Sequence, residues 1–228
     1  MGYTHYWDRP AVIDQGLFDA IRGDFERLIL PLADAGVALA GGLGEGPPEI
    51  TDQVIRFNGL DECGHPKNEE LVIPYPSESA EGIGPSSTAL DEGSDGLITR
   101  VKHRCCNGRC SYETLSLPRS LDMTWQRDAD EQGLYIDYVK TGFRPYDVAV
   151  TSILIIAKRY LKDRFTIQSN GGDHQWADAR RICQRVLGYG DWFGIVEEQI
   201  VEEWPGNPPK ERDVLLRTLV ELNPATLA

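Results

Sequence analysis

The chain has 228 residues, of which 41% are hydrophobic and 9% aromatic, and its formal net charge at pH 7 is −13. A chain of this length and apolar content can fold as one domain with a substantial core. The acidic excess argues against a duplex-binding surface, because neutralising phosphates requires clustered Lys and Arg. The sequence contains neither an apolar run of about 20 residues, the length of a membrane span, nor an apparent signal peptide. We therefore expect a cytoplasmic protein that binds neither membranes nor duplex nucleic acid.

The N-terminal part predicts a strand, a long helix and a second short strand. Residues 2–7 have the aromatic density of a strand, on which His5 is expected to be a packed or hydrogen-bonded sheet residue. Asp14 is placed to cap an amphipathic helix that runs to about Asp34. Residues 37–40 predict a short strand, and the glycine-rich loop after it matches no phosphate-binding motif.

A strand predicted over residues 53–57 is followed by Asn58 and Gly59, which predict a turn. Residues 61–111 predict an irregular insertion, whose part 74–95 is rich in Ser, Gly, Pro and acidic residues and is expected to be exposed. A long loop without secondary structure is uncommon inside a compact domain, so an insertion is the more natural interpretation.

The stretch 134–176 predicts the architectural centre of the protein. Residues 134–139 have strand character, and Pro145 suits the first turn of the helix that follows. This helix is apolar on nearly every side over residues 148–157, which is typical of a helix buried in a core. Residues 165–168 predict a further strand.

Two more helices are predicted towards the C-terminus. The first begins at about Asp173 and ends at Gly188, a residue suited to a helix C-cap. The second is an amphipathic helix over residues 214–222, which packs either on the domain or against another subunit. Together the elements predict an α+β fold in a single domain, 1–228: a mainly antiparallel sheet packed by three or more helices, with the irregular insertion 61–111.

The five cysteines, an odd number, fit reduced thiols better than a disulfide framework. Four of them lie at the two ends of the insertion. If the bracketing strands bring these ends together, the cysteines and a nearby histidine form a ligand set that suits structural Zn²⁺. The predicted ligands are Cys63, His65, either Cys105 or Cys106, and Cys110. Ordinary buried or free thiols are the alternative interpretation.

A second candidate site lies where the strand over residues 134–139 passes into the next helix. Lys140 and Arg144 flank this junction, where the free N–H groups of a helix N-terminus favour an anion. We predict a site for a small anionic, nucleotide-like ligand, in which the two cations hold a phosphate. The remaining predicted residues are Thr141 and Asn58 for hydrogen bonds, and Tyr146 and Trp176 for stacking. The alternative is structural, with Asp147 capping the helix and pairing with Arg144.

Carboxylate chemistry is a third, less specific candidate. Glu113, Asp147 and Asp173 are the acidic residues considered for acid–base chemistry or Mg²⁺ binding. Their spacing singles out no pair, and the chain has no nucleophile elbow, zinc-protease signature or kinase signature. Whether the protein is an enzyme therefore stays open at this point.

Four short motifs stand out: MGYTHYW at residues 1–7, FNG at 57–59, YET at 112–114 and KTxxRPYD at 140–147. With them the chain resembles an uncharacterised family of small proteins encoded by tailed bacteriophages and prophages. The likeness covers most of the chain, and the cysteine-containing excursion looks like an insertion between two strands. Members of that family often place Cys before the Lys-Thr pair and Ser-Asp-Gly in the later turn, where this chain has Val139 and Asn170-Gly171-Gly172.

The resemblance implies an accessory protein that acts in the cytoplasm of an infected host cell. Our leading expectation is an anti-defence protein that binds a small anionic ligand and so sequesters a nucleotide-like immune signal of the host. One alternative is an enzyme that acts on nucleotides or modified DNA precursors. Another is an acidic protein that inhibits or bridges a host protein. A homo-oligomer and a host protein partner are both compatible with these expectations.

Overall fold

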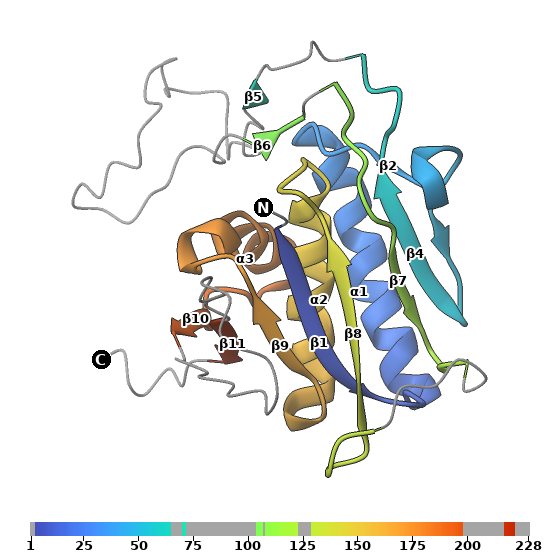
Figure 1. The fold of residues 1–228 in the computed structure, drawn as a ribbon, viewed down its shortest axis with the longest axis vertical. Helices are drawn as coiled ribbons and strands as arrows, with labels where there is room; N and C mark the ends of the chain where they lie inside the picture. Colours follow the sequence, from blue (N-terminus) through green and yellow to red (C-terminus); the bar gives the residue numbers. More distant parts are fainter. Residues whose placement is uncertain are drawn as a thin grey trace, which may run out of the picture.

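In the described part of the chain, three helices cover one face of a five-stranded antiparallel sheet with strand order β10-β11-β9-β1-β8 (Figure 1). The structure is a computed structural model and describes residues 3–64, 70–71, 104–106, 108–122, 129–197 and 217–221. The strands of this sheet are β1 (Thr4–Pro10), β8 (Leu134–Lys140), β9 (Thr166–Ser169), β10 (Phe193–Glu197) and β11 (Arg217–Glu221). The helices are α1 (Gln15–Asp34), α2 (Asp147–Leu161) and α3 (Asp173–Leu187). This arrangement confirms the predicted α+β class.

A second antiparallel sheet is organised around β4, which pairs with β2, β3 and β7. The strands are β2 (Leu39–Ala40), β3 (Glu49–Ile50), β4 (Val54–Gly59) and β7 (Leu115–Pro118), with a 3₁₀ turn η1 (Gly42–Gly44) between β2 and β3. A further pair joins β5 (Glu70–Leu71) to β6 (Arg104–Cys105). Another 3₁₀ turn, η3 (Lys162–Arg164), follows α2. In Figure 1, β5 and β6 lie together at one end of the molecule.

The turn predicted at Asn58 and Gly59 is wrong, because both residues belong to β4. They pair with Ala40 and Leu39 of β2. Asn-Gly favours a turn only through local backbone preference, whereas the ladder to β2 comes from a segment nearly twenty residues earlier. Residues 74–95, predicted to form an exposed part of the insertion, lie outside the described residues.

The caps predicted for α1 and α3 are present. The Asp14 side chain accepts hydrogen bonds from the backbone N–H groups of Gly16 and Leu17, at 2.9 and 3.2 Å. Gly188 ends α3 in the left-handed conformation, with a φ of 80°. Pro31 lies within the last turn of α1 and does not end the helix early. These boundaries follow from short-range chemistry, which is why the sequence predicts them well.

Helix α2 is buried along almost its whole length, as its apolar composition predicts. It lies between α1 and α3 and behind the large sheet (Figure 1). A stacked pair of rings, Phe25 of α1 and Phe57 of β4, links the helical layer to the second sheet with centroids 5.1 Å apart. None of the helices in the described ranges combines the length and the apolar character required to cross a bilayer.

The helix predicted over residues 214–222 is wrong where the structure describes it. Residues 217–221 form β11, which pairs with β10 and β9. Residues 214–216 and 222 lie outside the described residues. The apolar pattern of this stretch is short, and the edge that β9 offers for pairing decides its conformation.

Candidate functional site

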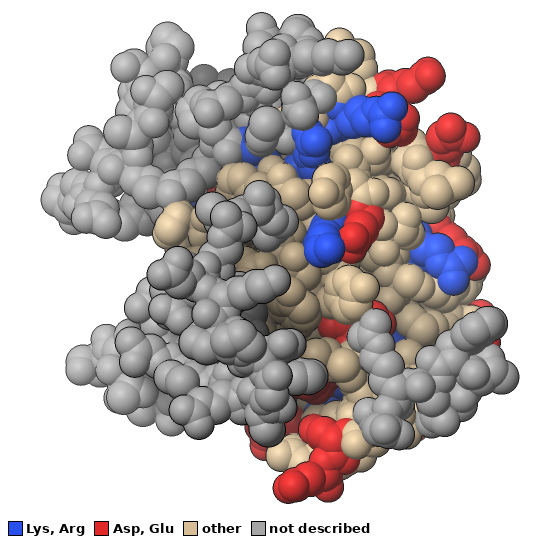
Figure 2. Space-filling model, viewed as in Figure 1, with Lys and Arg blue, Asp and Glu red and all other residues tan. Residues whose placement is uncertain are grey.

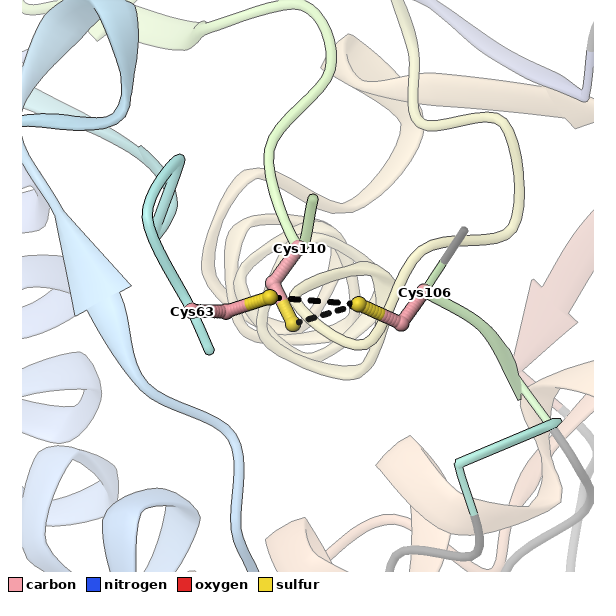
Figure 3. A group of neighbouring side chains, drawn as sticks. All are labelled: Cys63, Cys106 and Cys110. Atoms are coloured by element: carbon pink, nitrogen blue, oxygen red, sulfur yellow. Dashed lines mark hydrogen bonds between the residues drawn. The ribbon is translucent and has the colours of Figure 1, made fainter. Parts of the chain in front are cut away.

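Three thiols meet at one end of the molecule, and their sulfur atoms point towards one another (Figure 3). The Sγ atom of Cys106 lies 3.2 Å from that of Cys63 and 3.5 Å from that of Cys110. All three sulfur atoms lie within 4.8 Å of one another. Zinc–sulfur bonds of about 2.3 Å in a tetrahedron place sulfur atoms about 3.8 Å apart. The three cysteines can therefore hold a metal ion, and the two ends of the predicted insertion come together here.

Backbone contacts hold the segment that carries two of these cysteines against β4. The Cys110 N–H donates to the carbonyl of Leu60 at 3.0 Å, and the Arg109 N–H donates to the carbonyl of Cys106 at 3.0 Å in a tight turn. A Cβ atom on Gly59 would lie 1.9 Å from the Cys110 carbonyl oxygen. A glycine at position 59 is therefore required for this close approach.

The thiols lie beside the N-terminal end of α2. Arg144, in the loop before this helix, donates a hydrogen bond from Nη1 to the carbonyl of Cys106. Burial raises the pKa of both the Cys106 and the Cys110 thiol above the ordinary value, and the neighbouring Cys63 thiol raises both further. Without a metal these thiols are protonated at neutral pH, so a bound metal must displace their protons.

The structure shows where one of the two cysteines that the sequence left as alternatives lies. The Cys106 thiol belongs to the cluster, whereas the structure describes only the backbone of Cys105, in β6. The fourth predicted ligand, His65, lies outside the described residues. The ligand set that the geometry supports is Cys63, Cys106 and Cys110.

Two of the residues predicted to bind an anion are buried and form internal hydrogen bonds. The Thr141 hydroxyl donates to Oδ1 of Asp147 at 2.6 Å. The Tyr146 hydroxyl donates to the carbonyl of Glu113, with the carbonyl of Lys140 3.2 Å away. Tyr146 is fully buried, so its ring has no exposed face on which a base could stack. Both side chains instead fix the loop between β8 and α2.

Asn58 and Trp176 are also buried. The Asn58 side chain donates to the carbonyl of Tyr112 and accepts from its N–H group, both at 3.0 Å, which clamps β4 to the segment before β7. The Trp176 ring is fully buried and packs edge-on against His5, with centroids 5.3 Å apart. Neither residue faces an external ligand in this conformation.

Lys140 and Arg144 remain the accessible members of the predicted set. Lys140 is exposed, and its backbone N–H donates to Oε2 of Glu113 at 2.8 Å. Arg144 is partly buried and contacts Cys106. The structure thus brings both cations to the end of the molecule that carries the thiols. It does not bring all six predicted residues onto one open surface.

A buried hydrogen-bonded network connects the first strand to α2 and β9. Nε2 of His5 lies 2.8 Å from Oδ1 of Asp147, and Nδ1 lies 2.9 Å from the Ser169 hydroxyl. That hydroxyl also accepts from the Gly171 N–H at 2.9 Å. Serine, histidine and aspartate linked in this way can form a nucleophilic triad. Here all three side chains are fully buried, so the network is structural in this conformation.

Arg104 is a fully buried charged residue next to this network. Its Nη2 atom lies 3.3 Å from Oδ2 of Asp178 in α3 and 3.6 Å from Oδ2 of Asp147 at the start of α2. Its Cζ atom lies 4.6 Å from the centroid of the Phe143 ring. The side chain therefore connects the thiol-bearing segment to two helices.

The electrostatic surroundings of Asp147 keep it ionised. Burial by itself would raise its pKa, but the charges and hydrogen bonds of His5, Arg104 and Thr141 outweigh burial and lower the pKa below its ordinary value. Asp147 therefore pairs with Arg104 and contacts three segments: β1, β6 and the loop between β8 and α2. It does not cap α2, as the structural alternative predicted, because the N-cap position is Tyr146. Sequence reasoning missed Arg104, because no local pattern links it to acidic residues more than forty positions later.

The chain was compared with protein-family models, with curated proteins and with solved structures, and none of the three comparisons found a match. The geometry of the thiol cluster and its neighbours therefore carries the functional argument.

Proposed function

We propose that the protein binds one zinc ion through Cys63, Cys106 and Cys110, and that the metal ties together the two ends of the 61–111 insertion. The observation that carries this proposal is the convergence of three thiols, from two segments 43 residues apart, to within 4.8 Å. Thiolates are soft ligands, and zinc accepts them in a tetrahedral arrangement without redox chemistry. His65, two positions after Cys63, is the sequence-based candidate for the fourth ligand.

Metal analysis by native mass spectrometry tests the zinc proposal. We expect one zinc per chain in the wild type and loss of the metal in Cys110→Ser. Cys183→Ser is the matched control, because Cys183 is a buried thiol in α3 outside the cluster. It should keep its zinc. The proposal would be overturned if wild-type protein purified from zinc-containing buffers held no zinc and gave no thiolate-to-metal absorption with Co²⁺.

We further propose that the surface beside this metal centre binds a small anionic, nucleotide-like ligand, in the setting of a phage-infected cell. Two contacting segments supply cations in an otherwise acidic protein: Arg109 next to the thiols, and Lys140 and Arg144 around the start of α2. Figure 2 shows several Lys and Arg side chains gathered at this end of the molecule. Charge-assisted hydrogen bonds from such groups favour phosphate.

The ring at this surface is Tyr112, which is 50% exposed. It lies against Gly142, where an added Cβ atom would be 3.3 Å from the Tyr112 ring. We propose Tyr112 as the stacking residue in place of Tyr146 and Trp176, because those two rings are buried. Stacking on an exposed tyrosine does not require the core to open.

Native mass spectrometry of protein purified from phage-infected cells tests the ligand proposal, with AMP titration as a defined probe. We expect a retained phosphate-containing small molecule that is released unchanged on denaturation, and weaker AMP binding in Lys140→Ala and Arg144→Ala. Arg56→Ala is the control, because Arg56 pairs with Glu49 on β3. Conversion of the molecule would favour the enzyme alternative. A co-purifying host protein, with no small molecule and no AMP binding, would favour the interaction alternative.

A further inference from the structure

Arg104 occupies a position that a flexible cationic side chain seldom takes. It is completely buried, although it belongs to β6, a two-residue strand at the edge of the molecule. Its guanidinium lies between Asp147 of α2 and Asp178 of α3. Both partners belong to the helical layer, so Arg104 connects the thiol-bearing segment to α2 and α3.

The guanidinium lies over the Phe143 ring and makes two ion pairs, but these contacts do not satisfy its hydrogen-bond donors. Its nitrogen atoms make ion pairs at 3.3 and 3.6 Å, but none donates a hydrogen bond that meets normal geometry to any group in the described ranges. Burying a guanidinium has a large desolvation cost, which ion pairing offsets only when the position is well maintained. The placement of Arg104 must therefore depend on the backbone on either side of it.

That backbone is anchored two residues later, at the thiol cluster. The Cys106 thiol faces the thiols of Cys63 and Cys110, and the Cys106 carbonyl accepts a hydrogen bond from Arg144. A metal ion on these thiols would fix Cys106 relative to the start of α2. It would thereby restrict the segment from which Arg104 extends.

We propose that metal binding at the thiols and burial of Arg104 are coupled, so that Arg104 is a positioning residue for the metal centre. This inference rests on the zinc site proposed above. With the metal bound, Arg104 stays next to Asp147 and Asp178 and forms ion pairs with both buried carboxylates. Coupling between two sites is reciprocal, so loss of the Arg104 ion pairs must weaken metal binding by the same factor by which metal loss weakens the ion pairs.

The test measures zinc affinity by competition with a chromogenic chelator. Asp178→Asn keeps the shape of the side chain and alters none of the three thiols, yet we expect it to weaken zinc binding about tenfold, which is typical of residues that orient metal ligands. Arg104→Met should weaken it at least as much. The matched control is Asp173→Asn on the same helix, because Asp173 pairs with Arg180 at 2.7 Å instead. Its zinc affinity should be unchanged.

Cobalt substitution shows whether a variant has a lower metal affinity with the same ligands or a changed set of ligands. The thiolate-to-Co²⁺ absorption of saturated Asp178→Asn should match that of the wild type, because the ligands are the same and only the affinity falls. Zinc affinity within twofold of wild type in Asp178→Asn overturns the coupling, whether or not Arg104→Met folds. A wild type that binds no zinc overturns the proposed metal site and the coupling with it, so the two failures are distinguishable.

Discussion

The thiol cluster and the His5 network both join segments that are distant in sequence, but different interactions hold those segments together. Cys63 and Cys106 are 43 residues apart, whereas His5 and Asp147 are 142 residues apart. The His5 network is held together by hydrogen bonds within the chain, and Oδ2 of Asp147, which accepts none of them, lies 3.6 Å from Nη2 of Arg104. The thiols instead have the spacing of a metal site, and those of Cys106 and Cys110 have raised pKa values. The network should therefore stabilise the protein unconditionally, and the thiol cluster only when it is metallated.

Asp147→Asn tests the network most severely. It removes a buried charge that faces Arg104 and His5, which leaves a buried guanidinium without one of its two counter-charges. We expect the free energy of unfolding, measured by denaturant titration at saturating zinc, to fall by about 3–5 kcal/mol. Asp19→Asn on the exposed face of α1 should change it by less than about 0.5 kcal/mol. Equal effects of the two variants would contradict the central role of Asp147.

The thiol cluster and the His5 network should lose their contributions to stability at different acidic pH values. Since the folded pKa of Asp147 is lowered, its contribution to stability is complete above the unfolded pKa of about 3.9 and is lost as the pH falls through the folded pKa. Protonation of the thiols should release the metal at a higher pH than this. Unfolding curves against pH should show both steps in the wild type and lack the lower one in Asp147→Asn. An unchanged lower step in that variant would assign it to other carboxylates.

Chelation of the metal is the complementary test of the thiol cluster. A ligand present at one hundred times its Kd stabilises the folded state by about 3 kcal/mol. For a chain of this size, its removal should lower Tm by roughly 6–12 °C. Hydrogen exchange should locate the largest loss of protection near Cys106 and Cys110, a smaller loss near Asp178 and the least in β1. Uniform loss of protection would show that the two regions are not separable.

Gly59→Ala alters the thiol cluster through the backbone alone. The new Cβ atom would meet the Cys110 carbonyl oxygen, so β4 or the Cys110 segment must shift. Overpacking of this kind costs about 1–3 kcal/mol, and we expect weaker zinc binding as well. Gly23→Ala in α1 is the control, because its Cβ atom would meet nothing within 4 Å. That change should be neutral or stabilising by up to about 1 kcal/mol.

Ser169→Ala makes the smallest change to the His5 network. It removes one hydroxyl that contacts His5 and accepts from Gly171. Loss of such a hydrogen bond should cost about 1 kcal/mol, measured by thermal or denaturant unfolding. Ser120→Ala, on an exposed residue, is the comparison and should have little effect. An unchanged free energy of unfolding in Ser169→Ala would show that His5 forms another hydrogen bond in place of the lost one.

Features with a local physical cause were predictable. Asp14 caps α1, Gly188 ends α3, and the apolar run of α2 places it in the core. The thiol cluster was also anticipated, because two short groups of cysteines bracket one insertion. For the caps and for α2, neighbouring residues along the chain contain the whole signal, whereas the thiol cluster also required the two ends of the insertion to meet. The predictions failed at Asn58 and Gly59, and at β11, where pairing partners come from elsewhere.

Local sequence thus determined α1, α2 and α3, the caps of α1 and α3, and the identity of the metal-ligand candidates. Tertiary structure alone decided that Asp147 faces His5 and Arg104, and that Tyr146 and Trp176 are buried instead of exposed for stacking. The physical reason is the cost of leaving a charge or polar group unpaired in a core, which selects partners by proximity in space. The distance between two residues along the chain does not indicate whether they become partners in the folded core.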